Sequence, residues 1–257
     1  FNLNERYVPL IAPTQYKHLI NNYPNPRVIG MTSNPNVYAL MPGIGVIITW
    51  SMYLVRREKK NILLMIIFLL AVLMTMSRSG FVFTACGVLV FTLMFFYDSF
   101  RKGHFNKKVV RIILCSTAML ILFGFVIFKY LPKELTWRLI AGINIQTDNS
   151  FQQRLIKWQE YFLRFKSSPL FGMGPAKSIK FKHHVDNEWL LFLTQYGIVG
   201  CLYIVSVFLF PLFEGKNTFY KKLYLSILIG SALYMIPAAI YNSFQIMPLI
   251  MIIIGLI

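Results

Sequence analysis

The chain has 257 residues, of which 56% are hydrophobic and only 14% are charged. Ordinary soluble domains are less apolar, so the composition indicates a membrane protein. The net charge of +17 at pH 7 would suggest nucleic acid in a soluble protein, but here the basic residues gather at the ends of apolar segments, where topology and anionic lipid headgroups explain them. The three cysteines lie in apolar runs without CxxC or Cys/His spacing, which excludes a recognisable redox or zinc motif.

Apolar segments long enough to cross a bilayer follow a polar, proline-rich N-terminal loop of 36 residues. The segment 62–97 is interrupted only by Ser77-Arg78-Ser79-Gly80, which predicts two short spans meeting at a tight turn. The predicted spans are 37–55, two within 62–97, then 112–128, 190–213, 223–241 and one from Phe244. We therefore expect an all-α, polytopic integral membrane protein with about seven spans, forming a single membrane domain over 1–257. Because the chain starts without Met and stops in an apolar run, we expect it to be a fragment of a longer protein.

The basic residues of the short loops predict the orientation of these spans. Loops 56–60, 98–111 and 214–222 together carry 12 Lys and Arg residues, and simple alternation places all three loops on one face. That face should be cytoplasmic. The Ser77–Gly80 turn and the large loop 129–188 then share the opposite, extracytoplasmic face, where the large loop would carry amphipathic helices and the active site.

The stretch 148–200 contains a well-signalled amphipathic helix. Ser150 and Gln153 have the spacing of a capping box, and Pro169 marks the end of the helical pattern. The apolar positions that recur at helical spacing between them are Phe151, Leu155, Trp158, Phe162 and Phe165. Arg154 lies at the edge of this aromatic face, one turn from Trp158. Such a helix is expected to lie on a membrane or on other helices.

Two arginines are the first candidates for chemistry. Arg78 is the only formal charge in the 36 residues of 62–97, and an arginine within apolar spans costs several kcal/mol unless it reaches the interface or finds an anion. An interfacial anchor remains an alternative for Arg78, as does a polar helix edge for Arg154. Guanidinium groups bind phosphate oxygens bidentately, so two outer-face arginines would suit a diphosphate.

A polar run directly before the span 190–213 contains the candidate general bases. The run is His183-His184-Val185-Asp186-Asn187-Glu188, and histidine is the usual base near neutral pH. A solvated linker is the alternative. A metal site is disfavoured, because adjacent histidines do not converge on one ion in a regular helix. Gly172-Met173-Gly174 is too short for a phosphate loop and is interpreted as a turn.

Four landmarks in one order resemble the bacterial O-antigen ligase/polymerase superfamily. The first two are Arg27-x-x-Gly30…Asn34-Pro35-Asn36 and Ser77-Arg78-Ser79-Gly80. The others are Arg154…Trp158…Pro169-Leu-Phe-Gly-Met-Gly174 and Asp186-Asn187…Gly197-Ile-Val-Gly200. One position departs from the pattern: where many relatives have His-Asn, this chain has Asp186-Asn187.

The resemblance implies a glycosyltransferase of the bacterial cytoplasmic membrane with its active face outside. It would take a glycan from an undecaprenyl-diphosphate carrier and join it to an acceptor sugar, without cofactor or metal. Arg78 and Arg154 would hold the diphosphate, His184 or Asp186 would deprotonate the acceptor, and Arg27, Asn187 and Trp158 would contact substrate. Membrane lipids and other polysaccharide assembly proteins are the expected partners, and nucleic acid is not.

The family contains ligases, which attach finished glycans, and polymerases, which join repeat units on the carrier. The Asp-Asn form favours, by the resemblance, a polymerase of capsular or exopolysaccharide repeats. The alternatives from other classes are a transporter or flippase of lipid-linked polar cargo, and a sensor or structural membrane protein. The nearly uncharged spans and the absence of an internal repeat speak against transport.

Overall fold

The computed structural model describes residues 28, 30, 32, 34–101, 149–175, 185–214, 218–238 and 246–255. Within these ranges the chain forms seven helices and no strand, which confirms the all-α prediction for this part of the protein. The helices are α3 (Pro35–Arg56), α4 (Lys59–Thr75), α5 (Arg78–Arg101), α8 (Asn149–Ser167), α10 (Glu188–Glu214), α11 (Thr218–Tyr234) and α12 (Met247–Gly255).

Three of the described helices, α3, α5 and α10, are long and apolar enough to cross a membrane. Large apolar side chains are exposed along α4, α5 and α10, as expected for helices that face lipid. The protein is therefore a helical membrane protein. The predicted span 112–128 lies outside the described residues. In the described part of the span predicted at 223–241, residues 223–238, the helix ends at Tyr234, because Pro237 cannot continue it.

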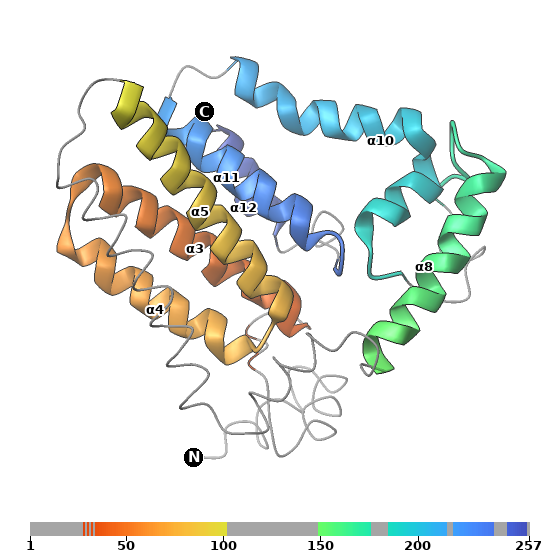
Figure 1. Ribbon diagram of the computed structural model, residues 1–257, viewed down its shortest axis with the longest axis horizontal. Helices are drawn as coiled ribbons and strands as arrows, with labels where there is room; N and C mark the ends of the chain where they lie inside the picture. Colours follow the sequence, from red (N-terminus) through yellow and green to blue (C-terminus); the bar gives the residue numbers. More distant parts are fainter. Residues whose placement is uncertain are drawn as a thin grey trace.

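The helices α3, α4, α5 and α11 form a bundle in which α3 lies between α4 and α5 (Figure 1). Asn34 caps the start of α3, its side-chain oxygen accepting the backbone N–H of Asn36 at 2.8 Å. Left-handed residues, Arg57 and Met76, end α3 and α4 and allow the tight reversals. The turn predicted within 62–97 therefore exists, although its two helices pack mainly against other helices than each other. The fully buried side chains of the core include Leu40, Ile44, Ile47, Phe83, Tyr224, Ile227 and Tyr234.

The described parts of the three basic loops lie at one end of this bundle. α3 and α5 run parallel, because Ala39 packs beside Gly80 near their starts and Trp50 Nε1 donates to Thr92 Oγ1 at 2.9 Å near their ends. An ion pair between Asp98 and Lys222 brings the start of α11 to the same end. This arrangement agrees with the predicted common face of the loops. Its assignment to the cytoplasm stays a prediction.

The contact between Gly80 and Ala39 sets the spacing of α3 and α5 directly below Arg78. A Cβ atom on Gly80 would lie 2.4 Å from the Cβ of Ala39, and neither methyl group has a torsion that could relieve the overlap. We expect Gly80→Ala to force the helices apart and lower stability by about 1–3 kcal/mol. Thermal unfolding of the protein in detergent measures this loss.

The matched control exchanges the two side chains across the contact. The double variant Ala39→Gly, Gly80→Ala removes one methyl group and adds the other, so it should recover most of the lost stability. A double variant no more stable than Gly80→Ala would show that packing at this contact is not what requires the glycine.

Candidate functional site

Arg78 is the first residue of α5 and its side chain is exposed. Ser77 precedes it as the helix cap, with Ser77 Oγ accepting the backbone N–H of Gly80 at 3.1 Å. A cation at a helix N-terminus is opposed by the helix dipole. The same dipole and the first backbone N–H groups favour an anion, so Arg78 and the start of α5 together form a positive surface.

Contacts between α10, α11 and α5 place residues 186–188 at the same end of the bundle as Arg78. The backbone N–H of Glu188 donates to Met235 O at 2.9 Å, and Trp189 Nε1 donates to Ala232 O at 2.8 Å. The end of α11 in turn packs on the first turns of α5, where the rings of Tyr234 and Phe83 meet edge to face. The start of α10, which carries carboxylates, is thereby held through α11 at the end of the bundle where α5 begins with Arg78.

α8 packs on the start of α10 and forms a second, smaller core with it. Tyr161, Val185 and Leu191 are completely or almost completely buried there, with Trp158 and Leu190 packed against them. Thr194 Oγ1 donates to Tyr161 O at 3.3 Å across the interface. Burial raises the pKa of the Tyr161 hydroxyl, and its hydrogen bond to the Val185 backbone opposes that rise. The hydroxyl therefore stays protonated and links α8 to the residue before Asp186.

Above this core Arg154 and Asp186 form an ion pair. Arg154 Nε lies 3.5 Å from Asp186 Oδ2, and the two side chains are 27% and 45% exposed. Two residues singled out separately in the sequence, from α8 and from the polar run before α10, are thus brought into contact. Neither is deeply buried, so both reach the surface of the site.

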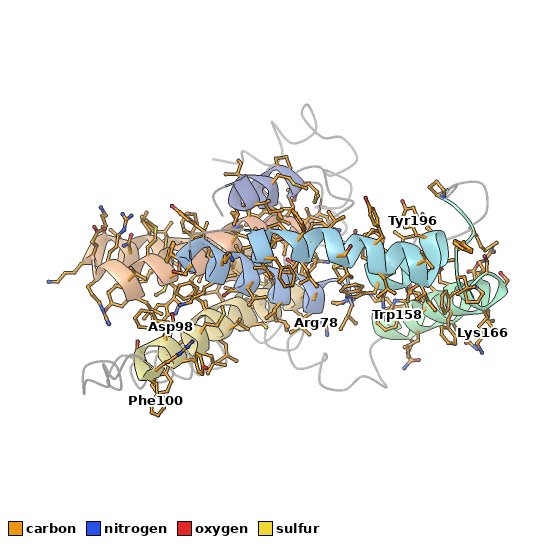
Figure 2. The ribbon with its side chains drawn as sticks, turned by 90° about the horizontal axis from the view of Figure 1, so that it is seen from above. Arg78, Asp98, Phe100, Trp158, Lys166 and Tyr196 are labelled. Carbon is orange, nitrogen blue, oxygen red and sulfur yellow. The ribbon has the colours of Figure 1, made fainter. Side chains whose placement is uncertain are left out.

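The structure also positions Trp158 and Asn187. Trp158 is half-buried one turn beyond Arg154, on the face of α8 that meets α10. Asn187 caps α10, its Oδ1 accepting the backbone N–H of Leu190 at 2.9 Å. In Figure 2, Arg78 lies at the end of α5 toward α8 and Trp158, while Asp98 and Phe100 mark the opposite end of α5.

Two linked features were not predicted from the sequence. α10 is interrupted at Gly197, and residues 168–174 form backbone hydrogen bonds to α10 on both sides of this break, an arrangement that we call the clasp. Gly197 has φ 68° and ψ −171°, which interrupts the helix and leaves backbone groups on both sides without helical partners. The 168–174 segment supplies those partners. Its four hydrogen bonds are Met173 N to Thr194 O, Gly174 N to Gln195 O, Ile198 N to Pro169 O and Val199 N to Leu170 O, all 2.9–3.1 Å. The turn predicted at Gly172–Gly174 lies just before these residues, at 169–171, where Gly172 N donates to Ser168 O at 3.0 Å. Residues 172–174 instead form an irregular segment that binds the backbone of α10, more than 20 residues away in sequence.

The structure does not describe every residue of the predicted site. Arg27, His183 and His184 lie outside the described residues, although the neighbouring Val28 donates its backbone N–H to Met74 O at 3.1 Å. Of the predicted apolar face of α8, Trp158 packs on the small core, whereas Leu155 and Phe162 are 39% and 47% exposed; the fully buried residue, Tyr161, is not part of that face. Within the described ranges, no group of His, Cys, Asp and Glu has the arrangement of a metal site.

The surface assembled in this way can bind an anion and accept a proton. Two guanidinium groups supply fixed positive charge and planar hydrogen-bond donors. A carboxylate lies next to one of them, and a histidine pair precedes it in sequence. An anionic leaving group and a hydroxyl nucleophile are the reactants that such a set of side chains suits.

Residues 63–205, more than half of the chain, match the protein-family model described as O-antigen ligase. The matched region contains Arg78, Arg154, Trp158, Asp186, Asn187 and Gly197. Comparison with curated protein sequences gives no match.

Proposed function

Because this chain belongs to the O-antigen ligase family, we propose that it is a membrane glycosyltransferase acting on undecaprenyl-diphosphate-linked oligosaccharides. It would transfer or polymerise these units on the outer face of the bacterial cytoplasmic membrane, in the assembly of capsule, exopolysaccharide or O-antigen. The Asp186-Asn187 form favours polymerisation over ligation. About seven spans and an extracytoplasmic position of the 129–188 loop belong to the same proposal.

The observation that best supports this function is the ion pair of Arg154 and Asp186 at the end of the bundle that carries Arg78. Family membership indicates glycan transfer, and this cluster supplies the two kinds of group that the reaction needs. The arginines are suited to the diphosphate, and the carboxylate to the acceptor. Arg27, Trp158 and Asn187 would contribute further substrate contacts.

The proposed reaction is a single displacement at the anomeric carbon of the donor sugar. The acceptor hydroxyl gives its proton to Asp186 or to His184, and its oxygen forms the new glycosidic bond. The bond between the anomeric carbon and the diphosphate oxygen breaks, and the lipid diphosphate leaves with the electron pair. Arg78 and Arg154 stabilise the negative charge that grows on that oxygen in the transition state.

The test is an assay of the whole protein reconstituted into liposomes with a lipid-diphosphate-linked oligosaccharide. Products are separated by length on a gel, and movement of labelled lipid between leaflets is followed in parallel. A ladder of products supports a polymerase, and a single addition to an acceptor supports a ligase. Movement of lipid without any new glycosidic bond would contradict the enzyme and favour the transporter or flippase.

A further inference from the structure

The pairing of Arg154 with Asp186 raises a conflict within the proposed site. The proposed function assigns Arg154 to the diphosphate and makes Asp186 a candidate base. In the structure, however, the two side chains form an ion pair with each other. While the pair is intact, the guanidinium edge at Nε faces a carboxylate and the carboxylate faces a cation. Each charge is then partly neutralised by the other, so neither group offers its full charge for its own task.

The geometry of the pair is that of a contact that can be exchanged. Its separation of 3.5 Å exceeds the roughly 2.7–3.2 Å of a well-formed hydrogen bond, and both side chains are partly exposed, so the pair contributes little stability. A diphosphate offers more negative charge and more acceptor oxygens than one carboxylate. It can therefore displace the carboxylate from the guanidinium.

The surroundings determine which partner moves. Val185 is buried in the small core, and the backbone N–H of Glu188 is bonded to Met235 O, so the backbone around Asp186 is anchored on both sides. Arg154, by contrast, reaches the pair with a long side chain from the surface of α8. The arginine can turn toward a ligand while the carboxylate stays in place.

We propose that Asp186 holds Arg154 until the donor binds, and that the lipid diphosphate then displaces the carboxylate and takes over the guanidinium. This inference rests on the proposed function. The exchange leaves the Asp186 carboxylate without its cation only when a donor is present. The carboxylate consequently becomes available to the acceptor hydroxyl after donor binding, which imposes an order of donor first and acceptor second.

Affinity for inorganic pyrophosphate tests the exchange directly, measured by calorimetry on the whole chain in nanodiscs of zwitterionic lipid. Asp186→Asn removes the competitor of the ligand, so we expect it to bind pyrophosphate about 1.5- to 5-fold more tightly than the unmodified protein, the range set by exposed ion pairs. Arg154→Gln should bind it more weakly. If Asp186 instead contacted the ligand directly, Asp186→Asn would lose that contact and would bind pyrophosphate more weakly.

Glu160→Gln is the matched control, because it removes the same charge from another arginine pair on α8, in which Arg164 Nη2 lies 3.0 Å from Glu160 Oε1. Its pyrophosphate affinity should equal that of the unmodified protein. Equal tightening in both variants would show a general charge effect and overturn the exchange, as would unchanged or weaker binding in Asp186→Asn.

Two further results separate this inference from the proposed function. If Arg154→Gln binds pyrophosphate as tightly as the unmodified protein, the proposed binding of the diphosphate by Arg154 is contradicted. This conclusion does not depend on the affinity of Asp186→Asn. Nanodiscs containing phosphatidylglycerol provide the remaining comparison. If its headgroups abolish the difference between Asp186→Asn and the unmodified protein, the displacing anion is a membrane headgroup, and exchange specific to the donor is overturned.

Discussion

We expect Arg78→Gln to transfer glycan roughly 10²–10³-fold more slowly than the unmodified protein, the effect of removing one donor aimed at developing charge. Arg78 is exposed at the start of α5, where the helix dipole opposes a cation, so the side chain contributes little to folding. The loss should therefore appear in kcat rather than in the amount of folded protein. Turnover of a lipid-diphosphate donor in liposomes measures it.

Arg101→Gln is the control for this prediction. Arg101 is an exposed arginine at the other end of the same helix, so the variant removes the same charge from α5 at a distance from the site. Its turnover should be normal. Arg78→Lys retains the charge without the planar fork and should fall between the two. Equal losses in Arg78→Gln and Arg101→Gln would contradict a role of Arg78 in binding the leaving group.

The second large effect is expected for Gly197→Ala. At φ 68° and ψ −171° the backbone is in a region that only glycine occupies readily, and a Cβ there would lie 2.2 Å from the carbonyl oxygen of Leu170. Backbone atoms cannot move aside as a side chain would, so the clasp must open. We expect a loss of at least ~2 kcal/mol from the packing of α8 on α10. Amide hydrogen exchange of Met173 and Gly174, which rises as the clasp opens, measures it.

Gly174→Ala separates backbone strain from steric overlap in this prediction. Gly174 also has a positive φ of 85°, but a Cβ at this position would have no neighbour within 4 Å. Only the strain term remains, about 1–2 kcal/mol. Equally fast exchange in Gly174→Ala and Gly197→Ala would contradict the steric argument and assign the whole effect to φ.

Local patterns predicted the helices well but not the faces that they bury. The spacing of aromatic residues and Pro169 predicted α8, which runs from Asn149 to Ser167. The same spacing placed Phe162 on the apolar face, but Phe162 is 47% exposed, and the neighbouring Tyr161 is the residue that is fully buried against α10. Periodicity gives a helix an apolar side, but the exact line of contact depends on the partner helix, and nothing local to α8 specifies the orientation of α10.

The candidate site shows the same division between local and long-range information. Charge in an apolar setting and the family resemblance singled out Arg78, Arg154 and Asp186. The ion pair between the last two could not be predicted, because it joins residues 32 positions apart through a fold that the sequence does not display. The clasp likewise could not be predicted, because it depends on the positive φ of Gly197, and a glycine in a sequence does not by itself indicate such a conformation.

The break in α10 also has a consequence for how the sequence can change over time. In the part of α10 before Gly197, several side chains are buried: Glu188, Leu191, Phe192, Thr194 and Gln195. In the part after it, none of residues 198–213 is buried. The hydrogen bonds of the clasp satisfy the backbone at the junction, so the exposed side chains of the second half can be exchanged for other apolar side chains without moving the first half. Cys201, Ile204 and Leu212, which pack against the main core, are exceptions. We expect evolutionary drift to concentrate in 198–213, where adaptation to a thicker or thinner bilayer can proceed independently of catalysis.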